Sequence, residues 1–224
     1  MLRRLDWEKN KFSGAGWRVF ERYFPLFLTL WVIFALYPNP FNLIISMQRV
    51  LSPDIDPDAV KFLLGDFPSD PAVIEDEVTE RIPYYYDWEV HNMPWYFPTT
   101  EGVLEKGKGD CKARAIVLAS ILEARHIPYR INSSPIHVWV EYEGKAETSL
   151  ENPRVKFYQR DPETGKRFFQ IPDIGLREVM DSIWRGFWHP MPDGRRALLL
   201  SGMFILALIR VLLYKNRAVG IDKI

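Results

Sequence analysis

Residues 107–111 read Gly-Lys-Gly-Asp-Cys, and they lead into a segment whose apolar residues fall at helical spacing. Asp110 is a favourable N-cap, so we predict a helix over residues 110–125 with Cys111 in its first turn. Cys111 is the only cysteine of the chain and cannot form an intramolecular disulfide. A helix N-terminus favours negative charge, and the thiolate is the reactive form of cysteine. This position therefore favours a nucleophile.

His137 opens the segment His137-Val138-Trp139-Val140-Glu141, whose alternating side chains predict a strand over residues 137–143. A strand holds an imidazole more rigidly than a loop does. From this position His137 can take the thiol proton of Cys111 and later protonate the leaving group. We therefore predict that Cys111 and His137 form a catalytic pair.

A third side chain is expected to orient the imidazole of His137. If Gly144-Lys145 forms a two-residue hairpin turn, residues 146–152 return beside the first strand and His137 faces Asn152. A three-residue turn places Glu151 opposite His137 instead, because a slip of one residue changes every pairing. We prefer Asn152, since glycine in the turn favours the shorter loop, and we keep Glu151 as the alternative.

These motifs resemble the transglutaminase-like superfamily, which has a papain-like cysteine fold, and the likeness covers roughly residues 70–155. The cysteine segment of the likeness comprises residues 98–104, 107–115, Leu118, Leu122 and 127–130, and the histidine strand comprises residues 137–141. Asn152-Pro153 stands where the family usually has Asp-Pro. His126 stands where the family usually has a glycine, at a position that favours a left-handed helix C-cap.

The resemblance implies an α+β domain in which the helix bearing Cys111 packs on an antiparallel sheet. It also implies acyl transfer through a thioester on Cys111, with a peptide bond or a glutamine side chain as the acyl donor. The acceptor is water in a cysteine protease or amidase, and an amine in a protein-glutamine acyltransferase. We rank hydrolysis first and expect a peptide or protein substrate. The alternative is a catalytically inactive, membrane-tethered peptide-binding module or scaffold of the same fold.

The aromatic cluster Trp95-Tyr96-Phe97 lies upstream of Cys111 and is open to two interpretations. It either lines the acyl pocket or belongs to the core.

The composition of the chain argues against nucleic acid, a metal and a cofactor as partners. Equal numbers of acidic and basic side chains, 29 of each, give no case for nucleic acid as a partner. One cysteine and four widely spaced histidines form no metal-ligand pattern, so we expect neither a metal nor a cofactor.

Two apolar segments bracket this region. Residues 197–214 form an apolar run that as a helix would cross about 27 Å, close to the thickness of the hydrocarbon core. The first segment is assigned to residues 23–47, but Pro38-Asn39-Pro40 interrupts it. A helix from about Val19 to Tyr37 and a kinked span ending near Met47 both remain open. We therefore expect the lipid bilayer as a partner.

Basic residues flank the two apolar segments unevenly. Six precede the first segment, and three follow the second; these are Arg3, Arg4, Lys9, Lys11, Arg18 and Arg22, and then Lys215, Arg217 and Lys223. By the positive-inside tendency both termini are expected in the cytoplasm, with the catalytic domain outside a plasma membrane.

The predicted organisation has six parts. They are a tail over 1–22, membrane segment 23–47, a stalk over 48–69, a transglutaminase-like domain over 70–190, membrane segment 197–214 and a tail over 215–224. Asp70-Pro71 predicts a helix that ends near Arg81. Further strands are predicted over 129–132, 155–160 and 167–171, and a closing helix over 173–188.

Overall fold

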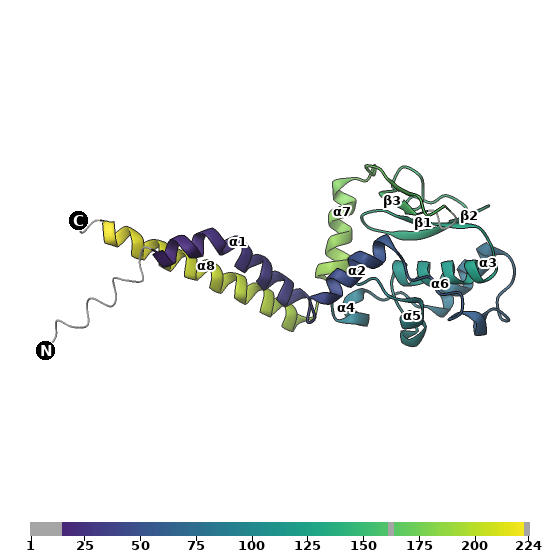
Figure 1. The fold of residues 1–224 in the computed structure, drawn as a ribbon, viewed down its shortest axis with the longest axis horizontal. Coiled ribbons are helices and arrows are strands. Elements are labelled where there is room, and N and C mark those ends of the chain that lie inside the picture. The colour runs from purple at the N-terminus through teal and green to yellow at the C-terminus, as the bar shows by residue number, and fades with distance from the viewer. Residues whose placement is uncertain (1–14, 161–163, 222–224) are drawn as a thin grey trace. The chain divides into compact units, whose positions relative to one another are not determined.

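The computed structural model of the chain describes residues 15–160 and 164–221. The fold is α+β, with a four-stranded antiparallel sheet (Figure 1). Its contacts divide the chain into two compact units. The first comprises Met1–Pro40 with Pro192–Ile224, and the second comprises Phe41–Met191. The cysteine and histidine motifs both belong to the second unit.

The described part of the first unit contains two helices, α1 (Ala15–Leu36) and α8 (Asp193–Ile221), which lie side by side (Figure 1). Their stretches Val19–Leu36 and Asp193–Lys215 are long and apolar enough to cross a bilayer. The two helices approach closely at Gly202, where a Cβ atom would lie 1.9 Å from Cε2 of Trp31. Nε1 of Trp31 also donates to the carbonyl of Leu199 at 3.3 Å.

The first apolar helix ends at Leu36, just before Pro38-Asn39-Pro40. Proline lacks an N–H group and disfavours helix in the residue before it, which explains this end. Residues 41–51 form a separate helix, α2 (Phe41–Leu51), which lies in the second unit. The sequence leaves two possible ends for the first apolar segment, near Tyr37 and near Met47. The helix in the structure ends close to the earlier of these positions.

In addition to α2, the second unit contains helical segments that precede or follow the strands in the sequence. They are η1 (Lys61–Leu63), α3 (Pro71–Arg81), α4 (Asp87–His91), α5 (Thr100–Lys106), α6 (Cys111–Ala124), α7 (Leu176–Ile183) and the π-helix η2 (Trp184–Trp188). The predicted helix start at Asp70 is confirmed, since its side chain accepts from the N–H of Ala72 at 2.9 Å. Residues 48–69, expected as a stalk, pack into this unit, where Val60 and Phe67 are buried in the core.

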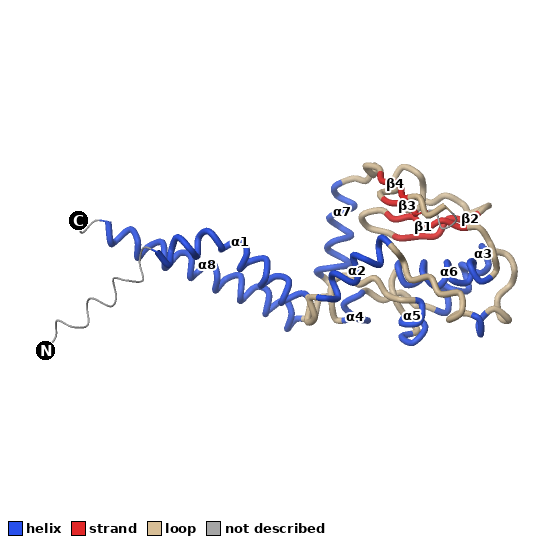
Figure 2. The backbone as a smooth tube through the Cα atoms, in the orientation of Figure 1, coloured by secondary structure: helices blue, strands red, loops and turns tan. Residues whose placement is uncertain are grey.

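The sheet has the order β2-β1-β3-β4 and is antiparallel throughout (Figure 2). Its strands are β1 (Tyr129–Ser133), β2 (Val138–Tyr142), β3 (Tyr158–Arg160) and β4 (Arg167–Phe169). The predicted pairing of β3 with β4 is confirmed, although part of its turn lies outside the described residues. Residues 146–152 form no strand, so the hairpin return expected beside β2 is wrong and β2 is an edge strand. Most of these side chains are polar, and Ser149 and Asn152 are residues that favour turns.

Helix α6 packs against β1 and β2, and its side chains supply much of the core. Ile121 and Leu122 are fully buried there. The helix ends in a Schellman motif: Ile127 N donates to Leu122 O at 2.9 Å, and His126 N donates to Glu123 O at 3.0 Å. His126 has φ of 58°, which confirms the left-handed C-cap predicted at this position. The core thus fixes α6, and with it Cys111, relative to the sheet.

Candidate active site

Cys111 is the first residue of α6, and two contacts hold the backbone just before it. Asp110 caps the helix, since its side chain accepts from the N–H groups of Lys112 and Ala113. Gly109 forms a parallel bridge with Tyr84, and its carbonyl accepts from Tyr85 N at 3.0 Å. A Cβ at Gly109 would lie 2.3 Å from Cβ of Ala113, so glycine is required here. The start of the cysteine helix is therefore fixed by its cap and by close backbone packing.

A tight turn presents His137, which is the residue just before β2 rather than part of the strand. Ser134 closes this turn, because its Oγ accepts from His137 N at 2.9 Å and its N–H donates to His137 O at 2.7 Å. The imidazole stacks on Trp139, with ring centroids 5.9 Å apart and an interplanar angle of 11°. Both the backbone and the ring of His137 are thus held.

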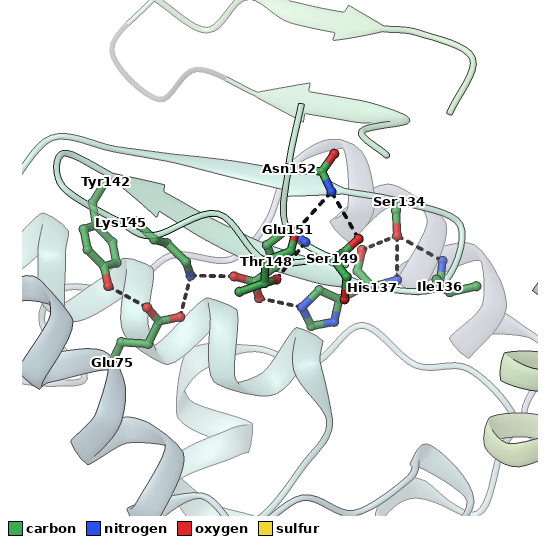
Figure 3. Close-up of polar contacts among 10 residues, drawn as sticks. All are labelled: Glu75, Ser134, Ile136, His137, Tyr142, Lys145, Thr148, Ser149, Glu151 and Asn152. Carbon is green, nitrogen blue, oxygen red and sulfur yellow. Dashed lines mark hydrogen bonds and ion pairs between the residues drawn. The ribbon is translucent and has the colours of Figure 1, made fainter. Parts of the chain in front are cut away.

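The three side chains Cys111, His137 and Glu151 line one pocket. Nε2 of His137 lies 2.7 Å from Oε1 of Glu151 (Figure 3), and Cys111 lines the same pocket as both side chains. Because Nε2 is engaged by Glu151, Nδ1 is the ring nitrogen left for the sulfur. Burial by itself lowers the pKa of His137, but its interactions with Cys111 and Glu151 outweigh this effect and raise that pKa to about 9. The imidazole is therefore protonated at neutral pH.

The acidic or amide side chain that contacts the imidazole of His137 is not the one that the sequence favoured. Among the described residues, Asn152 makes no hydrogen bond with His137, and it closes the loop that presents Glu151 (Figure 3). Its Nδ2 donates to the carbonyls of Thr148 and Ser149, both at 3.1 Å. The structure thus gives the alternative, Glu151, the contact with the imidazole. The predicted pairing of His137 with Asn152 is wrong because residues 146–152 do not pair with β2 at all.

Glu151 also has a second partner, which pattern reasoning missed. Lys145 Nζ lies 2.9 Å from Oε2 of Glu151 and 2.5 Å from Oε1 of Glu75 on α3. Glu75 in turn accepts from the hydroxyl of Tyr142 at 2.6 Å. Burial by itself raises the pKa of Glu151, but its bonds to His137 and Lys145 hold that pKa below the usual range. The sequence offers no local signal for these contacts, since Glu75 is far from Lys145 along the chain.

The pocket around these groups is small, with a volume of about 130 Å³. Its apolar wall includes Ala115, Leu118 and Val140. Tyr84 also lines it, and burial together with the nearby charge of Cys111 raises the pKa of this phenol. Tyr84 therefore keeps its proton and can donate a hydrogen bond beside the sulfur.

The aromatic cluster named in the sequence lies elsewhere. None of Trp95, Tyr96 and Phe97 lines the described pocket that holds Cys111. Phe97 is buried, and its N–H donates to Oγ of Ser46 on α2 at 3.1 Å. Of the two interpretations, Phe97 therefore has the core role, and the pocket takes its aromatic residues from Tyr84 and Trp139.

A buried ionic cluster lies behind the cysteine. Lys112 is in contact with Asp110, and its Nζ is 2.9 Å from Oδ2 of Asp87 on α4. All three side chains are less than 10% exposed. Burial raises the pKa of Asp87, and the charge of Lys112 opposes that rise. This cluster links α4 to the first turn of α6.

Within the part of the chain that the structure describes, His, Cys, Asp and Glu side chains form no group of three or more that could hold a metal ion. The comparisons with known proteins add no family assignment. No protein-family model matches the sequence, and no curated protein is significantly similar to it. The function is therefore inferred from the residues of the pocket.

Proposed function

We propose that this protein is a membrane-anchored, transglutaminase-like cysteine enzyme that hydrolyses peptide or amide bonds through a thioester on Cys111. The observation that carries the proposal is the convergence of Cys111, His137 and Glu151 on one pocket, with the carboxylate of Glu151 bonded to the imidazole of His137. An acidic side chain on a histidine that contacts a thiol is the arrangement that activates a cysteine nucleophile.

In the first half of the reaction the Cys111 thiolate attacks the carbonyl carbon of the scissile amide, and a C–S bond forms. The C–N bond then breaks, and the imidazolium of His137 gives its proton to the departing amine. In the second half neutral His137 takes a proton from water, whose oxygen attacks the thioester carbon. The C–S bond breaks, the acid product leaves, and the thiolate–imidazolium pair is restored.

Two donors can stabilise the oxyanion that forms in both halves. The side chain of Asp110 accepts hydrogen bonds from the N–H groups of Lys112 and Ala113. Of the amides in the first turn of α6, only the N–H of Cys111 therefore has no acceptor within the described chain. The hydroxyl of Tyr84 is the second donor, because it lines the same pocket in protonated form. Preorganised donors of this kind usually make a large contribution to acyl transfer.

The proposed location is the plasma membrane, with helices α1 and α8 as spans, the catalytic unit outside and both termini in the cytoplasm. Two observations support the spans. Both stretches are long and apolar enough to cross a bilayer. Only 6% of Val19–Leu36 and 11% of Asp193–Lys215 are buried, whereas the core helix of a globular domain is mostly buried. The distribution of basic residues supports the orientation.

The test is the pH dependence of Cys111 alkylation by iodoacetamide in the purified full chain. We expect fast labelling that persists well below pH 8, where an ordinary thiol is mostly protonated. His137→Ala should slow the labelling below pH 8 to the rate of an ordinary thiol, and Cys111→Ser should abolish labelling. Labelling at the rate of a free thiol, with no effect of His137→Ala, would overturn the proposal in favour of a binding or scaffold role.

A further inference from the structure

The carboxylate of Glu151 uses its two oxygens for two different partners (Figure 3). Oε1 contacts Nε2 of His137 at 2.7 Å, and Oε2 contacts Nζ of Lys145 at 2.9 Å. A carboxylate held at both oxygens cannot rotate about its last bond without losing one contact. The lysine therefore fixes which oxygen faces the imidazole, and in what plane.

Lys145 is itself held firmly. Its side chain is only 10% exposed, and its Nζ also lies 2.5 Å from Oε1 of Glu75. Oε2 of Glu75 accepts from the hydroxyl of Tyr142, at the end of β2, at 2.6 Å. The series Tyr142–Glu75–Lys145–Glu151–His137 thus joins α3, the end of β2 and the loop that presents Glu151 (Figure 3).

We propose that Lys145 is a positioning residue for acyl transfer at Cys111, because it holds Oε2 of Glu151 so that Oε1 stays against His137. This inference rests on the proposed function and adds a residue outside the predicted Cys–His–acid set. Lys145 does not line the pocket that holds Cys111, so it acts through Glu151. Glu75, seated on Tyr142, supports Lys145 in turn.

A positioning role and a simple charge effect predict opposite signs. Lys145 is a cation near an imidazolium, so removing its charge alone would make His137 easier to protonate. Removing the support of Glu151 would instead make His137 harder to protonate, because the carboxylate no longer stays in place. The other titratable groups around the imidazole are Cys111, Tyr84, Arg114 and Glu75, which line the same pocket, and these stay unchanged in the variant.

The experiment compares the wild-type full chain with Lys145→Met, which removes the charge but keeps an unbranched chain. Lys156→Met is the matched control, since Lys156 is also mostly buried and ion-paired, with Glu141 at 2.6 Å, and makes no ion pair with Glu151 among the described residues. The first readout is the titration of the His137 ring by NMR, with its signal assigned by its loss in His137→Ala. The second is the pH profile of Cys111 alkylation by iodoacetate, whose negative charge makes its rate sensitive to the imidazolium.

We expect Lys145→Met to lower the pKa of His137 by about one unit. The high-pH limb of the iodoacetate profile should move down by the same amount. Lys145→Arg, which keeps the charge, should restore part of the shift. Tyr142→Phe removes the hydroxyl that holds Glu75 without changing any charge, and should give a smaller shift in the same direction. These two variants decide the matter if Lys145→Met does not fold.

An unchanged or higher pKa of His137 in folded Lys145→Met would overturn the positioning role. An effect of equal size in Lys156→Met would do the same. Failure of the proposed function has a different signature, because wild type would then label slowly and independently of His137. The NMR titration would in that case still show whether Lys145 controls the Glu151–His137 contact.

Discussion

Glu151 Oε1 lies 2.7 Å from Nε2 of His137, which leaves Nδ1 of the ring for the sulfur of Cys111. A carboxylate on one nitrogen fixes the ring and stabilises the imidazolium that acyl transfer requires. The neighbouring Asn152 serves this arrangement indirectly, since its amide closes the loop on which Glu151 sits. The two adjacent residues thus have separate roles, and substitutions can distinguish them.

Glu151→Gln should reduce turnover about 100-fold or more, because it removes the charge that stabilises protonated His137 while keeping the side-chain shape. Asn152→Ala is the matched variant and should cost less than about tenfold, since it removes exposed loop hydrogen bonds only. Steady-state hydrolysis of a peptide substrate measures both. A larger loss for Asn152→Ala than for Glu151→Gln would mean that the amide, not the carboxylate, orients His137.

Stability should depend on pH through His137 and Glu151. The pKa of His137 is raised from 6.5 to about 9, so its contribution is fully present below pH 6.5 and is lost as the pH rises through 9. The pKa of Glu151 is lowered from 4.5, so its contribution is present above pH 4.5 and is lost as the pH falls through the folded value. Thermal midpoints of the full chain should therefore fall between pH 7 and about 9.5. His137→Gln should flatten that decline, and an equally steep decline in this variant would contradict the assignment.

Tyr84→Phe should lower the turnover number by about 100-fold, the usual loss for one oxyanion donor. Alkylation of Cys111 should change little, because that reaction forms no oxyanion. Comparing the two rates in one preparation separates a transition-state donor from a packing residue. Equal losses in turnover and alkylation would show that Tyr84 acts on the nucleophile itself.

Gly109→Ala should destabilise the second unit by about 1–3 kcal/mol, because the new Cβ overlaps Ala113 and pushes on the first turn of α6. Gly65→Ala is the control, since no atom lies within 4 Å of the Cβ it would add. Thermal or denaturant unfolding of both variants measures the difference. A stability loss of the same size in Gly65→Ala would refute the steric explanation.

Gly202→Ala should separate α8 from α1 and lower the thermal midpoint in detergent, since the new Cβ overlaps the indole of Trp31. The effect should shrink in a Trp31→Ala background, because the obstacle is then absent and the two substitutions couple. Ser201→Ala, one residue away, serves as the control. Additive losses in the double variant would show that the two residues do not meet.

The features that the sequence predicted well are those with local causes. Asp70 and Asp110 cap helices because each carboxylate bonds amides two or three residues ahead. The left-handed turn at His126 likewise follows from where the helix must end. The choice between Asn152 and Glu151 depended instead on a strand pairing that never forms.

Long-range contacts explain the rest of what pattern reasoning missed. Lys145 looked like one residue of a turn, and nothing near it in sequence points to Glu75. Tyr84 belongs to no motif of the sequence, and the bridge to Gly109 brings it to the pocket of Cys111. Such contacts arise because α3 packs near the turn after β2, and the loop that follows α3 packs near the start of α6. No local motif encodes either contact.

The buried cluster of Lys112, Asp87 and Asp110 has a consequence for how the protein opens. Detaching α4 would remove Asp87 and leave the buried ammonium of Lys112 facing one carboxylate instead of two. Local fraying of α4 is thereby made costly. Amide hydrogens of α4 and of the first turns of α6 should consequently exchange together, as one cooperative opening unit. The segment that presents Cys111 would then open only together with α4.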